Sequence, residues 1–289
     1  MCFGGRLLIG LGALLSGIEA SAEELSVVSY NVHGLPAWIA RDDPAARMPV
    51  IGKLLSRYDV ALVQEVWGYQ DVLATSVSQG TKLQGNLARS TPLGWLSFFC
   101  GSCGAGLSLY TDPPRERVVD SAAVPYDLCA DWLLSANDCW ATKGFLFARL
   151  RLASGSEVDV YDTHLEAGDG EDDFVVRKSQ MEKLRAFLSA RSAGRAVIVG
   201  GDLNLAYDVA RPRGLVEGFA TALGLRDTGA RPADLSRWEK RIDWILFRDG
   251  SDVLLAPTAS GEELDFVQDG APLSDHPAVF ARFRVSRKP

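Results

Sequence analysis

Apolar runs that end on polar side chains recur along this chain of 289 residues. The clearest covers residues 196–205, AVIVGGDLNL, in which an apolar run stops on two glycines before Asp202 and Asn204. Such a short run is typical of a buried strand, and side chains two apart in extended chain point the same way. We therefore expect Asp202 and Asn204 to face one pocket, with a turn after a core strand as the alternative. Gly200 and Gly201 leave room for another backbone or a ligand to come close.

The same reasoning predicts strands and helices that alternate along the chain. Predicted strands cover residues 25–32, 59–63, 106–110, 144–152, 157–163, 196–199, 242–247 and 278–285. Helical spacing of apolar residues predicts one helix that begins near residue 44 and others over residues 68–78, 171–191 and 213–223. Because there is no internal repeat or long linker, we expect one α/β domain over residues 23–289.

The N-terminus has the pattern of a secretory signal. Arg6 precedes an apolar stretch over residues 7–18, and Ala20-Ser21-Ala22 follows. We expect a signal peptide over residues 1–22 and a secreted or periplasmic protein. A retained membrane anchor is the less favoured reading, because the stretch is short for a span of about 20 residues.

Export would make the cysteines candidates for disulfides. Four remain after residue 22, and we favour the local pairs Cys100 with Cys103 and Cys129 with Cys139, while the other pairings and a zinc site stay open. They fall in residues 83–139, the least regular part of the chain. There the apolar segment 95–99, WLSFF, is interpreted as an inward-facing strand, with a lipid-contacting patch as the alternative.

The net charge of the chain argues against binding of long nucleic acid. The net charge is −7 and the pI is about 5.1. Nucleic-acid-binding proteins usually carry a basic face, and here the only local concentration of basic residues lies between Arg211 and Arg241. A nuclease role is therefore less favoured than hydrolysis of a smaller ester.

The predicted strand ends carry one set of polar residues. They are Asn31, Glu65, His164, Asp202 with Asn204, Asp243, and Asp275 with His276. With His33, which follows shortly after Asn31, all three histidines of the chain lie in these clusters. Carboxylate and amide oxygens suit Mg²⁺ or Ca²⁺, which points to metal-assisted hydrolysis of a phosphate ester. No G-x-S-x-G or Walker sequence offers a rival mechanism.

Six motifs carry a family resemblance. SYNVHGLP, VQEVW, DTHLEAG, GGDLN, RIDWIL and SDHPAV stand in the order found in the endonuclease/exonuclease/phosphatase superfamily of divalent-metal phosphoesterases, which the chain resembles. The resemblance implies an α/β fold, a four-layer α/β sandwich with two facing mixed β-sheets flanked by helices. The site would lie at one rim.

The resemblance also implies roles for the site residues. Glu65 would be the principal ligand of Mg²⁺, or of Mn²⁺, Co²⁺ or Ca²⁺, with Asn31 beside it and Asp275 near the metal. Asp202 and Asn204 would position and activate the attacking water. His276, oriented by Asp243, would be the general base or a phosphate contact, and which of Asp202 and His276 takes the proton stays open. His164 would stabilise charge on the phosphate or protonate the leaving group.

Within the superfamily the chain is most similar to bacterial neutral sphingomyelinases. The segment 140–147, WATKGFLF, matches their lysine-glycine segment, so Lys143 would give its ammonium to a lipid phosphate, with an exposed strand-start lysine as the alternative. This branch implies a phospholipid substrate, transient membrane contact and a monomer with no obligate protein partner. One departure is that residues 248–273 hold Phe266 as their only aromatic residue, where these enzymes carry an aromatic hairpin. Trp38 or residues 95–99 are candidate substitutes.

Three alternative functions stay open. A secreted nuclease and a phosphatase for inositol phosphates or other small esters belong to the same superfamily. A non-catalytic binding protein on this fold would be expected to lack some of Glu65, Asp202 and His276, and all three are present.

Overall fold

The computed structural model describes residues 1, 22–78, 80–85, 104–112, 116–130, 139, 141–234, 236–238 and 241–288. Most of the expected signal peptide, the segment 95–99, and Cys100 and Cys103 lie outside these residues. Among the described residues, none of the helices combines the length and the apolar character needed to cross a bilayer.

Two six-stranded sheets form the centre of the fold. The first has the order β11-β14-β1-β2-β4-β3, and the second has the order β5-β6-β7-β8-β10-β9. Each sheet is mixed, because β1 runs parallel to β2 and β7 runs parallel to β8 whereas the other pairs are antiparallel. The strands of the first sheet are β1 (Glu23–Asn31), β2 (Val60–Gln64), β3 (Thr81–Gln84), β4 (Ser108–Thr111), β11 (Val253–Glu262) and β14 (Val279–Arg287). Those of the second sheet are β5 (Glu116–Pro125), β6 (Gly144–Leu152), β7 (Glu157–His164), β8 (Ala196–Asp202), β9 (Arg226–Asp227) and β10 (Asp243–Arg248).

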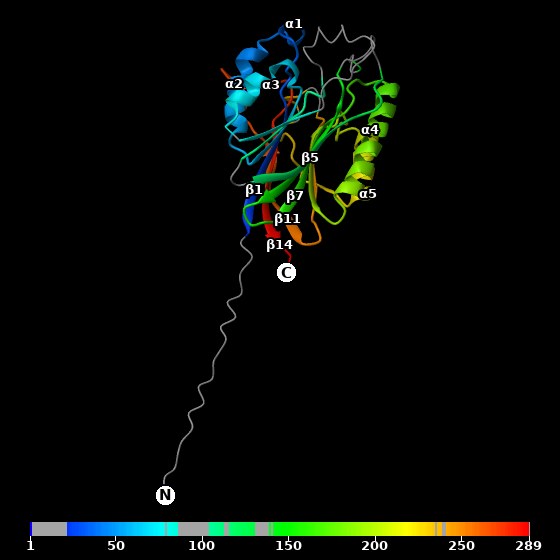
Figure 1. The fold of residues 1–289 in the computed structure, drawn as a ribbon. Helices are drawn as coiled ribbons and strands as arrows, with labels where there is room; N and C mark the ends of the chain where they lie inside the picture. Colours follow the sequence, from blue (N-terminus) through cyan, green and yellow to red (C-terminus); the bar gives the residue numbers. More distant parts are fainter. Residues whose placement is uncertain are drawn as a thin grey trace.

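Helices cover the outer face of each sheet (Figure 1). Beside the first sheet lie α1 (Ala37–Ala40), α2 (Pro44–Leu55), the 3₁₀ turn η1 (Trp67–Tyr69) and α3 (Gln70–Ser76); beside the second lie α4 (Glu171–Arg191) and α5 (Ala210–Leu223). Three apolar clusters separate the layers. One joins the two sheets, one packs α4 and α5 on the second sheet, and one packs α2 and α3 on the first. The predicted four-layer sandwich is confirmed.

Strand register brings the polar strand ends to one rim. In the first sheet Asn31 is opposite Gln64, the residue before Glu65. In the second sheet Asp202 lies between His164 on β7 and Asp243 on β10. Gly201 allows this pairing, because its φ is +145° and a Cβ there would lie 1.9 Å from the Thr163 carbonyl oxygen. The predicted close approach at Gly201 is therefore confirmed.

Several predicted elements differ from the structure at the edges of the sheets. The strands β3, β5 and β11 were not predicted, because edge strands have exposed faces and lack a continuous apolar run. The predicted helix over residues 68–78 is the turn η1 followed by the short α3. Helix α5 begins at Ala210, three positions before the predicted start, because Pro212 is tolerated in a first turn. The predicted disulfide between Cys129 and Cys139 is present.

Candidate active site

One rim of the two facing sheets collects the predicted site residues. Hydrogen bonds and ion pairs join residues from both sheets, and the set comprises Asn31, Glu65, Lys143, His164, Asp202, Asn204, Asp243, Asp275 and His276. Most are buried, although they come from loops and strand ends. Burying so many polar groups is unfavourable unless they bond one another, so their mutual contacts define the site.

Asp202 lies at the centre of these contacts. Its Oδ2 accepts a hydrogen bond from Asn31 Nδ2 at 3.0 Å, and its Oδ1 accepts one from the backbone N–H of Asn204 at 2.9 Å. Asn204 has a φ of +49°, so the chain turns after Asp202 and does not stay extended. The expectation of two side chains aligned along a strand was wrong for Asn204, and the alternative of a turn describes its backbone.

His276 and Asp243 form a buried pair beside Asp202. His276 Nδ1 lies 3.0 Å from Asp243 Oδ2 and 3.3 Å from Oδ1, and its Nε2 lies 3.5 Å from Asn31 Nδ2. Burial lowers the pKa of His276, but the facing carboxylates of Asp243 and Asp202 outweigh burial and raise that pKa above its usual value. The Asp243 carboxylate therefore holds the ring by Nδ1 and leaves Nε2 facing Asn31 and Asp202.

Lys143 and His164 form the second buried pair. Lys143 is 4% exposed, and its Nζ donates to His164 Nε2 at 2.7 Å and to the Leu165 carbonyl at 3.0 Å. Burial, together with the Lys143 charge, holds the pKa of His164 well below its usual value, so this imidazole is neutral. An ammonium only donates, so Nε2 accepts and the imidazole proton resides on Nδ1. The positive charge of this pair lies on Lys143, and the alternative of an exposed lysine is wrong.

Glu65 supplies a carboxylate where the two sheets meet. It follows β2 with a φ of +58°, and its Oε1 lies 3.7 Å from His164 Nε2. Burial raises the pKa of Glu65. Ligand atoms of Glu65, His164 and Asp202 lie within 4.8 Å of one another, close enough to hold an ion. Since His164 Nε2 already accepts from Lys143, the open donors are oxygens, and an oxygen donor set fits a hard cation such as Mg²⁺.

Asp275 lies at the outer edge of the site with a partner that the motifs did not indicate. Its Oδ1 is 2.9 Å from His33 Nδ1, and its side chain is 58% exposed. The hydrogen bond that His33 donates to the Asp275 carboxylate raises the pKa of His33. His33 could have been found from the sequence, because it is the one histidine of the chain for which no role was assigned.

Arg47 was missed altogether. From α2 it donates to the carbonyls of Val32 and Leu273 at 2.8 and 2.7 Å, and to that of His33 at 2.9 Å. It therefore ties the loop after Asn31 to the loop before His276. No sequence signal marked it, because a helical arginine reads as an ordinary exposed residue.

The segment before His276 does contain a hairpin, formed by β12 (Val267–Gln268) and β13 (Ala271–Pro272). Its turn consists of Asp269 and Gly270, with a polar tip. Phe266 is 4% exposed and packs edge-on against Tyr30, with the ring centroids 5.1 Å apart. The short helix α1 exposes Trp38 to 73% and Ile39 to 43%.

Comparisons with known proteins identify a family and several relatives of this chain. The model of the Endonuclease/Exonuclease/phosphatase family matches residues 28–276. A sphingomyelinase of Mycobacterium tuberculosis is 29% identical over 278 residues, which is 89% of this chain and 52% of the relative. The inositol phosphosphingolipids phospholipase C of Schizosaccharomyces pombe is 29% identical over 194 residues, 64% of this chain and 42% of the relative. The chain spans about half the length of these curated relatives.

A solved structure shows the same fold. Beta toxin from Staphylococcus aureus, solved with bound magnesium ions, superposes with a TM-score of 0.62 at 16% identity, over 90% of this chain and 99% of that chain. This likeness concerns the fold alone. Because the family model matches residues 28–276, which is most of the chain and includes all the strand ends that form the rim, the chain belongs to the endonuclease/exonuclease/phosphatase family.

Proposed function

We propose that this chain is a metal-dependent phosphodiesterase of the phospholipase C type that hydrolyses sphingomyelin to ceramide and phosphocholine. The observation that carries the proposal is the rim network, in which Asn31 holds Asp202 and Asp243 holds His276 beside the Glu65 carboxylate. The similarity to a mycobacterial sphingomyelinase supports the choice of substrate.

The oxygen donors define the proposed metal site. Glu65 and Asn31, with Asp275 at the outer edge, would hold Mg²⁺, or Mn²⁺, Co²⁺ or Ca²⁺ in its place. When bound, such an ion neutralises the phosphate and the charge that develops on the leaving oxygen. The chain's own residues then orient the water and move its proton.

We propose that Asp202 accepts the proton of the attacking water. Its carboxylate is held on one side by Asn31 and on the other by the backbone of Asn204, so it is oriented before substrate binds. His276 would contact a phosphoryl oxygen, since its raised pKa favours the charged imidazolium. Asp243 would keep that ring in place through Nδ1.

We assign the Lys143 and His164 pair to the side of the phosphate opposite Asp202 and His276. Lys143 carries the positive charge and His164 is neutral, so Lys143 would stabilise the phosphoryl oxygens and His164 would position the ammonium. Both groups are buried, which strengthens their interaction with an anion relative to water.

The proposal also covers how the protein reaches a lipid substrate and how it is exported. The exposed Trp38 and Ile39 on α1 would make transient contact with the membrane surface in place of an aromatic hairpin. We further propose that the chain acts as a monomer and that residues 1–22 direct its export as a secreted or periplasmic enzyme.

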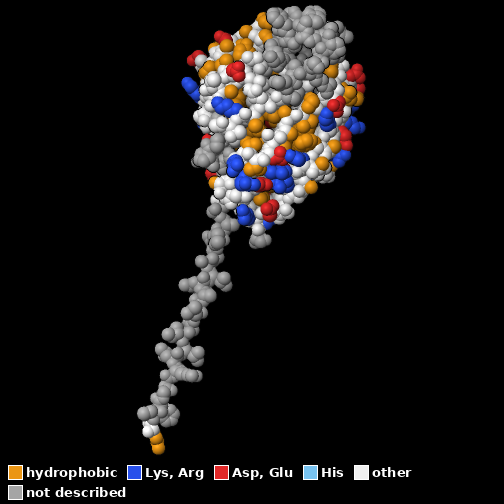
Figure 2. All heavy atoms as spheres, in the orientation of Figure 1, with side chains coloured by type: hydrophobic (Ala, Val, Ile, Leu, Met, Phe, Trp, Pro, Cys, Tyr) orange, Lys and Arg blue, Asp and Glu red, His pale blue; other side chains and the backbone are white. Residues whose placement is uncertain are grey.

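The charge pattern favours a lipid or small ester over long nucleic acid. On the face drawn in Figure 2, Lys and Arg side chains are interspersed with Asp and Glu. Near the rim, Arg211 pairs with Glu171 and Arg241 with Asp208, so these basic residues are already neutralised. A basic groove for a phosphate backbone would leave such arginines open.

The test is phosphocholine release from sphingomyelin vesicles by the purified mature protein, with Mg²⁺ and with EDTA. We expect metal-dependent release that is lost in His276→Ala. Arg226→Ala, a change of an exposed side chain at the far end of the second sheet, serves as the matched control. No release from folded, metal-loaded protein would overturn the sphingomyelin assignment, and DNA and inositol phosphates would then be tested.

A further inference from the structure

The guanidinium group of Arg47 lies between two loops of the candidate active site. Its side chain is only 11% exposed. Nη1 donates to the carbonyls of Val32 and Leu273 at 2.8 and 2.7 Å, and Nη2 donates to that of His33 at 2.9 Å. Burial of a charge is unfavourable unless its donors are satisfied, and buried loop carbonyls need donors in turn. The arginine and the two loops therefore hold one another in place.

Both loops carry residues of the proposed reaction. The two carbonyls of the first loop directly follow Asn31, whose Nδ2 donates to Asp202. In the second loop Leu273 precedes Ser274, whose Oγ donates to the Asn31 carbonyl at 2.7 Å and accepts from the His276 N–H at 3.3 Å. The side chains of Asn31 and His276 then approach each other, with 3.5 Å between Nδ2 and Nε2. Arg47 thus fixes the backbone on both sides of this contact.

Helix α2 carries Arg47 on a rigid support. The helix has Pro44 in its first turn, and Asp43 caps it by accepting a hydrogen bond from the Ala46 N–H at 3.1 Å. Met48, the next residue after Arg47, is fully buried in the cluster that packs α2 on the first sheet. Groups carried by regular elements position a site more precisely than groups carried by loops. The carbonyls of the two loops are therefore referred to a fixed point.

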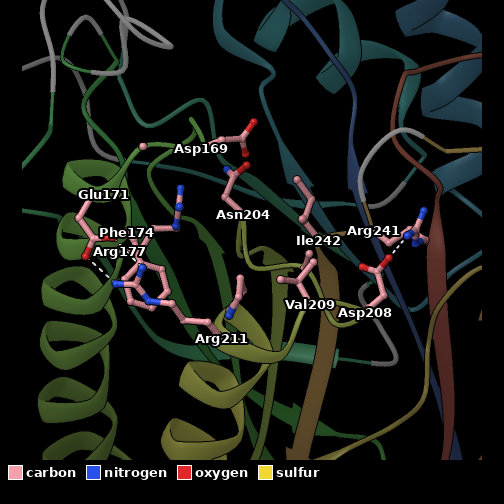
Figure 3. Close-up of a pocket in the computed structure, with 13 residues that line it drawn as sticks. Asp169, Glu171, Phe174, Arg177, Asn204, Asp208, Val209, Arg211, Arg241 and Ile242 are labelled. Carbon is pink, nitrogen blue, oxygen red and sulfur yellow. Dashed lines mark hydrogen bonds and ion pairs between the residues drawn. The ribbon is translucent and has the colours of Figure 1, made fainter.

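The second half of the fold contains a similar arrangement. Strands β1 and β7 are each followed by a connecting segment, a packed helix and a parallel neighbouring strand. Arg177 on α4 is 5% exposed, and its Nη1 lies 2.8 to 3.2 Å from the carbonyls of residues 166–168, in the loop after His164. Figure 3 shows this side chain pointing from α4 toward Asn204, in a cleft of about 460 Å³ between the N-terminal turns of α4 and α5. In each half, an arginine on the helix binds carbonyls of the loop that follows a site residue.

We propose that Arg47 is a positioning residue of the phosphodiesterase, which fixes Asn31 and His276 relative to each other without contacting the substrate. The inference rests on the proposed function and adds a residue that acts on the site only through backbone carbonyls. Arginine suits this task because its planar guanidinium presents several donors in a fixed fork, whereas the ammonium of a lysine is a single point.

The decisive variant is Arg47→Lys, which keeps the charge and removes the fork of donors. The assay is hydrolysis of the p-nitrophenyl ester of phosphocholine, or of sphingomyelin vesicles if this ester is not cleaved. Water adds to phosphorus, the bond from phosphorus to the nitrophenolate oxygen breaks, and phosphocholine is released. We expect kcat and kcat/KM to fall together by about 10- to 100-fold, the scale on which small displacements of site groups slow catalysis.

Arg57→Lys is the matched control. Arg57 follows the C-terminal end of α2, and its Nη2 donates to Asp265 Oδ1 at 2.9 Å. It therefore also joins the region of α2 to the chain before His276, but through an exposed side chain and not through the carbonyls of the site loops. We expect native kcat in this variant, with each protein assayed well below its own melting temperature.

A double-variant cycle separates positioning from a purely structural role. Asn31→Ala removes one of the two side chains that Arg47 is proposed to fix. In the Asn31→Ala background, Arg47→Lys should lower kcat by less than about threefold, because residues that act as a unit in catalysis are not additive. A residue that only stabilises the fold would cost the same factor in both backgrounds.

The NMR signals of the His276 ring give a readout that needs no turnover. We expect these signals to move in folded Arg47→Lys and to keep their native positions in Arg57→Lys. If Arg47→Lys does not fold, Arg47→Gln, which keeps amide donors without the charge, replaces it in each measurement.

The outcomes distinguish this inference from the proposed function. Native kcat in Arg47→Lys, or an equal cost in both backgrounds, overturns the positioning role and leaves the phosphodiesterase standing. If the native protein cleaves neither the ester nor sphingomyelin, the proposed function falls and the NMR signals decide: moved His276 signals support the positioning of this ring by Arg47, and native signals overturn it.

Discussion

Replacement of Asp243 by asparagine should separate catalysis from stability. Asp243 is 2% exposed, and both of its carboxylate oxygens lie within 3.3 Å of His276 Nδ1. A hydrogen bond that involves a charged group contributes about 1.5 to 3 kcal/mol. If the transition state loses this hydrogen bond, kcat/KM falls by roughly 10- to 150-fold, because about 1.4 kcal/mol corresponds to a factor of ten.

The fold should tolerate this substitution. Burial raises the pKa of Asp243, which means that the folded protein disfavours its charged form, so a neutral amide removes an unfavourable buried charge. The pKa of His276 should fall in the variant, because Asp243 is one of the carboxylates that raise it. We therefore expect a similar melting temperature together with a His276 titration moved to lower pH.

The assays are steady-state hydrolysis of a soluble phosphodiester, thermal melting, and NMR titration of the histidine ring. Asp249→Asn is the matched control, because Asp249 follows the opposite end of β10 and pairs with Arg226 at 3.1 Å. Native kcat/KM in Asp243→Asn would refute the reasoning. A cooperative loss of folding would also refute it, since the pair would then be structural.

Three further substitutions test other parts of the molecule. Glu65→Gln should weaken Mg²⁺ binding by about tenfold or more in a calorimetric titration, and unchanged affinity would remove Glu65 from the metal site. Burial holds the pKa of Asp162 well above its usual value. The folding stability therefore falls as the pH rises from the pKa of this carboxyl in the unfolded chain toward its pKa in the folded protein. Asp162→Asn removes this loss and should raise the melting temperature at neutral pH. A variant melting curve with the native pH dependence would contradict this. Cys129→Ser removes the disulfide to Cys139 and should lower stability by about 2 to 3 kcal/mol in a denaturant titration, whereas an equal midpoint would show that the bond constrains little.

The sequence alone was sufficient for the central strands and for the identity of the rim residues. Residues 196–202 are apolar up to two glycines because β8 is buried on both faces, and α4 covers residues 171–191 as its spacing predicted. Asn31 and Glu65 lie at the ends of the neighbouring parallel strands β1 and β2, and His164 and Asp202 end the neighbouring parallel strands β7 and β8, so each pair had to meet at one rim of its sheet. These are local rules, and they can be read from a few consecutive residues.

Tertiary structure decided which side chains bond one another and what surrounds them. Lys143 meets His164 only because β6 and β7 pair with Gly144 opposite His164, and Arg47 reaches the catalytic loops from a helix. The cleft beside Asn204 exists because two helices distant in sequence begin next to each other. Burial and partner determine whether a lysine is a surface charge or a site cation, and both depend on contacts between segments far apart in the chain. No local pattern records such contacts.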